Sequence, residues 1–129
     1  MQESITFPCR PEFVSLARHA VRTMLGDGGV PPVTVGVAEL VTSELVTNSI
    51  LWSTSGEDGS PIELLVLWDS DAQTIRIEVI DGGPRPLGDR TDQDPDQHGR
   101  GLMIVDYFTK YGHEKSKTGQ IWWAELPWT

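Results

Sequence analysis

The sequence predicts an α+β fold, a two-layer sandwich with a mixed, mainly antiparallel sheet and helices on one face. Residues 62–68 and 74–80 form a strand pair, with clean apolar alternation in the second and a short polar turn between them. Two longer segments before this pair have apolar side chains at helical spacing. Directly joined strands pair antiparallel, and amphipathic helices bury their apolar stripes against such a sheet. We expect a single domain over residues 1–129.

The segments before the strand pair are bounded by proline and glycine. Residues 4–9 predict a short strand, and a helix follows with Pro11 in its first turn and the glycines of 26–29 at its end. A second helix begins after Pro31 and Pro32 and ends near Trp52, with an apolar stripe along its length. The following stretch, 53–61, is polar and contains glycine, which predicts a loop.

The second half of the chain predicts a loop, a helix and two strands. Residues 85–98 contain Pro, Gly, Asp and Gln with almost no apolar side chains, which is typical of a long functional or disordered loop. A third helix follows Gly99, and two strands surround the turn 116–119. In the last strand Trp122 and Trp123 are expected to point to opposite faces, one inward and one outward.

Composition excludes several classes of function. The net charge of −9 argues against a nucleic-acid binder or a protein of anionic membranes, since both need clustered Lys and Arg. No apolar run approaches the ~20 residues of a membrane span, and the start lacks a signal-peptide layout, so we expect a cytoplasmic protein. The single cysteine, Cys9, excludes an internal disulfide and favours a structural thiol. The scattered histidines do not favour a zinc site.

Glu44 and Asn48 are the first candidates for chemistry. They lie one turn apart on one face of the second helix, beside an apolar stripe that includes Val41 and Leu45. Asn48 could ligate Mg²⁺ through its amide oxygen, while the carboxylate of Glu44 holds a water or accepts a proton. The alternative is a solvated polar pair on a surface helix.

A turn directly after the strand 74–80 contains the second candidates. Asp81 could accept a hydrogen bond from an exocyclic amino group such as that of adenine. Glycine at 82 and 83 lets the backbone pass close to a flat ligand. The alternative is an ordinary strand-ending turn, for which Asp-Gly is a common choice.

The third candidate is the segment Gly99-Arg100-Gly101-Leu102, which leads into a helix. A helix N-terminus offers free backbone N–H groups and a positive dipole end to a phosphate, and Arg100 adds charge. The alternative is glycine used as loop punctuation. The segment is not a P-loop, because the Gly-Lys-Ser/Thr ending is absent, and its spacing and surroundings exclude a Rossmann site.

Taken in order, these segments resemble a known family. The matching pieces are Glu44-Leu-Val-Thr-Asn48, Val79-Ile-Asp-Gly-Gly-Pro84, Gly99-Arg-Gly-Leu102 and Gly119-Gln-Ile-Trp-Trp-Ala-Glu-Leu126. They are similar to the GHKL fold, the histidine-kinase-like ATPase fold. Within it, they most resemble the small anti-sigma-factor serine/threonine kinases and the stand-alone regulatory ATP-binding proteins abundant in actinobacteria. The resemblance covers nearly the whole chain.

The resemblance implies a role for each motif. Asn48 would coordinate a Mg²⁺ that bridges the phosphates of ATP, and Glu44 would be the base or the water-orienting carboxylate. Asp81 would contact the adenine amino group, with Gly83 shaping the pocket. Residues 99–102, that is Gly99, Arg100, Gly101 and Leu102, would close over the phosphates, and residues 85–98 would form the lid.

The resemblance also implies partners. A kinase of this type phosphorylates a serine on an anti-anti-sigma factor of the STAS type and, in an alternative complex, sequesters a sigma factor. Relatives suggest a homodimer, with a monomer as the alternative. Direct contact with nucleic acid or membrane is not expected.

The chain departs from the family pattern at two places. The segment Ser49-Ile-Leu-Trp52-Ser53 lies where relatives usually have a basic or histidine-bearing segment after the asparagine, which would remove a polar edge of the phosphate site. Gln120 and Ile121 lie where a threonine is frequent, which would remove one hydroxyl from the adenine network. Two alternatives to the kinase therefore stay open: a nucleotide-dependent module that binds partners without catalysis, and a GHKL-like scaffold that has lost ATP binding.

Overall fold

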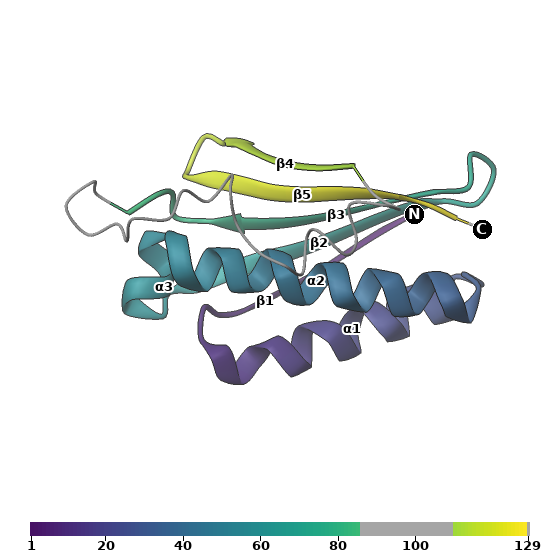
Figure 1. Cartoon of the computed structure of the whole chain (residues 1–129), viewed down its shortest axis with the longest axis horizontal. Helices are drawn as coiled ribbons and strands as arrows, with labels where there is room; N and C mark the ends of the chain where they lie inside the picture. The colour runs from purple at the N-terminus through teal and green to yellow at the C-terminus, as the bar shows by residue number, and fades with distance from the viewer. Residues whose placement is uncertain (86–109, 129) are drawn as a thin grey trace.

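The computed structural model describes residues 1–85 and 110–128 (Figure 1). Its described strands form one sheet in the order β1-β2-β3-β5-β4, and every neighbouring pair of them is antiparallel. The strands are β1 (Gln2–Pro8), β2 (Pro61–Asp69), β3 (Thr74–Asp81), β4 (Lys110–Lys115) and β5 (Gln120–Pro127). The predicted α+β class is confirmed, and the sheet is antiparallel in its described part rather than mixed.

The helices cover one face of this sheet (Figure 1). A short 3-10 turn, η1 (Pro11–Phe13), leads into α1 (Val14–Asp27), and α2 (Pro32–Trp52) follows. Proline at the start of each helical segment suits the first turn, where no backbone N–H is needed. The two predicted helices are confirmed close to their expected bounds.

The expected loop at residues 53–61 contains a third helix, α3 (Thr54–Asp58), so that prediction was wrong in part. The hydroxyl oxygen of Ser53 accepts a hydrogen bond from the backbone N–H of Gly56 at 3.1 Å and caps the helix. Gly59 ends it in the left-handed region, with φ +72°. A five-residue helix defined by its caps has no apolar periodicity from which it could have been predicted.

Alternation along the strands separates the two faces of the sheet. On β3 the buried positions Ile75, Ile77 and Val79 face the helices, and Asp81 continues the same row at the strand end. On α2 the buried stripe continues through polar residues near its C-terminal end, so polar groups meet at one end of the core. The fully or largely buried residues of α2 are Thr34, Val35, Ala38, Val41, Thr42, Leu45, Val46, Asn48, Ser49 and Trp52.

The register of β3 and β5 places the aromatic pair as predicted. Trp122 lies opposite Val79 and is buried on the helix side. Trp123 lies opposite Glu78 on the other face, where it is partly exposed and the guanidinium of Arg76 lies 4.6 Å from its ring centroid. One indole therefore belongs to the core and the other to the open face of the sheet.

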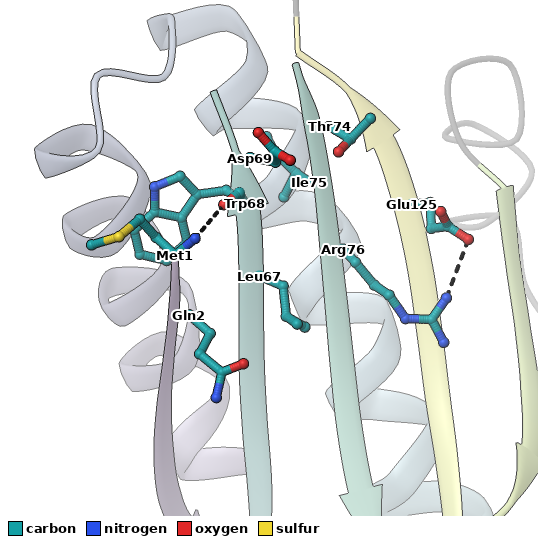
Figure 2. A pocket seen from close by; sticks show the side chains of 9 residues that line it. All are labelled: Met1, Gln2, Leu67, Trp68, Asp69, Thr74, Ile75, Arg76 and Glu125. Atoms are coloured by element: carbon teal, nitrogen blue, oxygen red, sulfur yellow. Dashed lines mark hydrogen bonds and ion pairs between the residues drawn. The ribbon is translucent and has the colours of Figure 1, made fainter. Parts of the chain in front are cut away.

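A hollow lies at the end of β3 that is far from Asp81 (Figure 2). There the N-terminal ammonium group donates a hydrogen bond to the carbonyl oxygen of Trp68 at 2.8 Å. The guanidinium of Arg76 bonds the carboxylate of Glu125 at 3.1 Å. No helix in the described part of the chain is long and apolar enough to cross a membrane.

Candidate functional site

Asp81 is the centre of a buried polar cluster at the end of β3. The residue is 4% exposed. Its Oδ2 accepts hydrogen bonds from Ser49 Oγ at 2.6 Å, Trp122 Nε1 at 3.0 Å and, more weakly, Gln120 Nε2 at 3.5 Å. Its Oδ1 accepts from the backbone N–H of Gly83 at 2.9 Å. The cluster joins α2, β3 and β5, so the carboxylate is held in a fixed orientation.

The electrostatics of Asp81 reflect two opposing effects. Burial raises the pKa of its carboxyl group, while the hydrogen bonds from Ser49, Gly83, Trp122 and Gln120 act in the opposite direction. All four partners are donors, which suits an ionised, acceptor-only carboxylate. Within the described residues Oδ1 accepts from Gly83 alone, so this oxygen keeps acceptor capacity for an amino group of a ligand.

The turn after Asp81 is fixed against α3 by its own backbone. The N–H of Thr54 donates to the carbonyl oxygen of Gly83 at 2.9 Å, and the N–H of Gly82 donates to Ser55 Oγ at 2.8 Å. Gly83 has φ +105°, a conformation that strongly favours glycine. The predicted role of Gly83 in shaping a pocket remains a prediction, and its backbone conformation is consistent with that role.

Asn48 is the second element of the site. It is completely buried, and within the described part of the chain neither its Oδ1 nor its Nδ2 has a hydrogen-bond partner. Leaving a buried polar group unsatisfied costs about 1–3 kcal/mol, so native proteins rarely keep one without a reason. The side chain offers one acceptor and two donor hydrogens, which suits a ligand that combines a hard cation with anionic oxygens.

Glu44 lies one helical turn before Asn48 and is partly buried. No group of three or more His, Cys, Asp or Glu side chains that could hold a metal ion occurs among residues 1–85 and 110–128. Mg²⁺ is commonly held by one or two protein oxygens while phosphates and waters supply the rest. Asn48 fits such a site, in which most ligands come from the nucleotide.

The phosphate-binding segment expected from the sequence falls outside the described residues. This applies to Gly99, Arg100, Gly101 and Leu102, and to the lid after its first residue, Arg85. The guanidinium of Arg85 donates to the carbonyl oxygens of Ser53 at 3.0 Å and Ile50 at 2.8 Å, and its Nε lies 3.6 Å from a carboxylate oxygen of Glu57. Its backbone N–H donates to the carbonyl oxygen of Trp52 at 3.1 Å. The last residue described before the expected lid is therefore fastened to the end of α2.

Three residues of the cluster were missed by sequence reasoning as functional partners: Ser49, Gln120 and Trp122. A serine within the apolar stripe of α2 was the one available signal for Ser49, because a buried hydroxyl needs a partner. The network contains a hydroxyl from another element, since Ser49 supplies one at 2.6 Å from Asp81. The effect of the threonine hydroxyl missing from the last strand stays a prediction. Ile121 lies opposite Ile80 on the other face of the sheet and takes no part in the network.

Comparison with known protein families identifies the architecture that carries this site. A family model described as the histidine kinase-like ATPase domain matches residues 7–118. The chain belongs to this family. No curated protein has a significant match to it. The histidine kinase-like ATPase domain implies nucleotide binding, usually with Mg²⁺. The buried carboxylate of Asp81 fits an amino group of the nucleotide, and the unpartnered amide of Asn48 fits Mg²⁺.

Proposed function

We propose that this histidine kinase-like ATPase domain binds ATP with Mg²⁺ and phosphorylates a serine of an anti-anti-sigma factor, while sequestering a sigma factor in an alternative complex. One observation carries the proposal. Asn48 is buried, and both polar atoms of its side chain lack a partner among the described residues, one turn after a carboxylate at Glu44. The family supports nucleotide binding, and the finer assignment rests on the motifs.

The two ends of the nucleotide would be held by different elements. The adenine amino group would donate to Oδ1 of Asp81, whose other oxygen is held by Ser49 and Trp122. Asn48 would contribute its amide oxygen to Mg²⁺, which neutralises charge on the phosphates. Because Ser49 follows Asn48 directly on α2, one helix fixes both the metal ligand and the adenine acceptor.

Glu44 would act on the attacking group. In phosphoryl transfer the serine oxygen forms a bond to the γ-phosphorus, the bond from that phosphorus to the β,γ-bridging oxygen breaks, and ADP leaves. The carboxylate of Glu44 would accept the hydroxyl proton during this step. The reaction needs positioning and charge neutralisation more than covalent chemistry, which matches a site built from a few fixed polar groups.

The test is a matched pair of substitutions on α2. Glu44→Gln keeps size and hydrogen bonding but removes the base, so we expect ATP·Mg²⁺ affinity within about threefold of wild type and loss of transfer by about 100-fold or more. Glu39→Gln is the control, because Glu39 pairs with Arg22 at 2.7 Å and is outside the proposed machinery. Calorimetry measures binding, and γ-labelled ATP with a purified STAS-domain antagonist measures transfer.

Each outcome separates the candidate functions. Normal transfer by Glu44→Gln would contradict the role of Glu44 as the base. ATP binding by the wild type without label on the antagonist would favour a nucleotide-dependent binding module. No saturable binding at millimolar ATP would favour a scaffold that has lost the nucleotide.

A further inference from the structure

Trp52 ends α2 one helical turn after Asn48 and has an unsatisfied indole. It is 6% exposed, and within the described residues its Nε1 has no hydrogen-bond partner. An indole N–H can only donate, so the missing partner must be an acceptor. Burying this donor without an acceptor destabilises the folded chain, so its presence at this position points to an acceptor supplied by a ligand.

A second tryptophan at the same end of the core shows the contrast. Trp122 is 4% exposed, and its Nε1 donates to Oδ2 of Asp81 at 3.0 Å. Both indoles are buried to a similar degree, but the described protein groups satisfy one of them and not the other. Burial of an indole at this end of the fold therefore does not in itself prevent a hydrogen bond to the protein.

The backbone of Trp52 lies between the two parts of the proposed nucleotide site. Its carbonyl oxygen accepts from the N–H of Arg85 at 3.1 Å, and two residues further the N–H of Thr54 donates to the carbonyl oxygen of Gly83 at 2.9 Å. On its other side, Asn48 lies one turn earlier on the same helix face. Trp52 is thus fixed between the metal-ligand position and the turn that follows Asp81.

We propose that the indole N–H of Trp52 donates a hydrogen bond to a phosphate oxygen of the bound nucleotide, beside Asn48. This inference rests on the proposed function. Asn48 and Trp52 together present an amide oxygen, an amide NH₂ and an indole N–H, all buried and without partners in the described chain. A group with several anionic oxygens satisfies both donors at once, and the cation bound to it satisfies the amide oxygen.

Trp52 would restore a polar group that its place in the sequence was expected to remove. Trp52 occupies the place where a basic or histidine-bearing segment was expected, and its side chain was predicted to remove a polar edge of the phosphate site. In the structure it supplies a donor there, although a neutral one. Trp52 is then a further nucleotide-binding residue that contributes a directional hydrogen bond without adding positive charge.

Binding measurements on three variants test the inference. Trp52→Phe keeps an aromatic ring and removes the N–H, and we expect it to weaken ATP·Mg²⁺ binding by about 10- to 100-fold, the usual effect of a hydrogen bond to a charged group. Trp52→His keeps a ring N–H and should recover most of that loss. Trp68→Phe is the control, since Trp68 is also 6% exposed but lies at the other end of the sheet, and it should leave affinity unchanged within about twofold.

Indole N–H resonances give a second readout that does not depend on activity. The five tryptophans give five ¹H–¹⁵N side-chain signals, and the signal lost in Trp52→Phe identifies Trp52. On saturation with ATP·Mg²⁺ we expect this proton to shift downfield, because it gains an anionic acceptor, while the Trp68 signal stays in place.

The outcomes are separable from those of the proposed function. If the wild type binds ATP but the Trp52 signal does not move, or if Trp52→Phe binds normally, the inference is wrong and the proposed function survives. If Trp52→His binds as weakly as Trp52→Phe, lost packing explains the effect and the inference is again wrong. If the wild type shows no saturable ATP binding, both fail together.

Discussion

The two ends of β3 differ in whether their polar groups have hydrogen-bond partners within the described protein. At the Thr74 end, the N-terminal ammonium group donates to the carbonyl oxygen of Trp68 at 2.8 Å, and the N–H of Trp68 donates back to that of Met1 at 2.9 Å. The N–H of Trp128 donates to the carbonyl oxygen of Gln73 at 2.8 Å. This end uses the chain termini to satisfy its own backbone.

At the Asp81 end, three buried side-chain atoms on α2 lack partners within the described residues. They belong to Asn48 and Trp52. Asp81 itself is surrounded by donors, so the shortage on α2 falls in the part of the site where a metal and phosphates would lie. A further buried side-chain atom without a partner in the described residues, Ser116 Oγ, lies in the turn before β5. The Thr74 end of β3 therefore satisfies its polar groups within the protein, while the Asp81 end keeps buried groups to which a ligand can hydrogen-bond.

The largest effect is expected from Asn48→Leu, which replaces both unpartnered atoms by apolar groups of similar volume. We expect ATP·Mg²⁺ affinity to fall by about 100-fold or more, and the free energy of unfolding without nucleotide to rise by about 1–2 kcal/mol, since an unsatisfied buried amide is removed. Calorimetry and urea denaturation measure the two quantities. A less stable variant that still binds ATP would show that the amide of Asn48 is satisfied by hydrogen bonds within the protein and does not bind the nucleotide.

Asp81→Asn tests the pH dependence of the same end. The pKa of the Asp81 carboxyl is raised above its ordinary value of 3.8, chiefly by burial, so the folded state binds this proton more tightly than the unfolded chain does. Its contribution to stability is therefore fully present below about pH 4 and is lost as the pH rises through the native pKa. We expect the unfolding free energy of the wild type, relative to Asp81→Asn, to fall over that range. Denaturant titrations at several pH values measure it, and a flat difference would be inconsistent with a buried carboxyl.

Cys9 gives a smaller and alkaline effect at this end. Burial, together with the negative charge of Asp81, raises the pKa of its thiol from 9.0 to about 11. The native state thus favours the neutral thiol, and its contribution to stability is lost between pH 9 and pH 11. Cys9→Ala should lack this decrease in a denaturant titration. A thiol reagent should react slowly with the folded wild type at pH 8 and quickly after unfolding, and fast reaction in the native state would contradict the burial.

The smallest effect is expected at the opposite end. Glu125→Gln removes one carboxylate from Arg76, which keeps an ion pair with Glu78 at 2.6 Å and its position over the ring of Trp123. Half-exposed pairs of this kind contribute below about 1 kcal/mol, and ATP affinity should not change. Urea denaturation and calorimetry check both points. A change in nucleotide binding would contradict the proposal that only the Asp81 end of β3 serves the ligand.

The parts of the fold that the sequence predicted are those with strong local signals. The second helix has proline at its start and a long apolar stripe, and β3 has a clean alternation that ends at Asp-Gly. Helix α3 was missed because it depends on a hydroxyl cap at Ser53 and a left-handed glycine. Gln120 and Ile121 were considered together, although successive residues of a strand point to opposite faces, and of these two only Gln120 reaches Asp81.

The motif residues of the candidate site could be named from the sequence, but their partners could not. Glu44, Asn48 and Asp81 could be named from residue type and spacing, and the structure brings Asn48 and Asp81 to the same end of the core through Ser49. That serine and Asp81 are 32 positions apart in sequence, so their contact is a tertiary fact. Whether the amide of Asn48 has a partner likewise depends on packing, which a single sequence does not encode locally.

The fastening of Arg85 to α2 has an electrostatic consequence. A helix C-terminus carries a partial negative charge from its unpaired carbonyl groups, and Trp52, the proposed phosphate contact, lies at the C-terminus of α2. Left alone, that end would repel an anionic ligand. The guanidinium of Arg85 binds the carbonyl oxygens of Ile50 and Ser53, which offsets the helix dipole where phosphates would approach. This one cation thereby reduces the repulsion that the C-terminus of α2 would exert on an anion, in a chain whose net charge is −9.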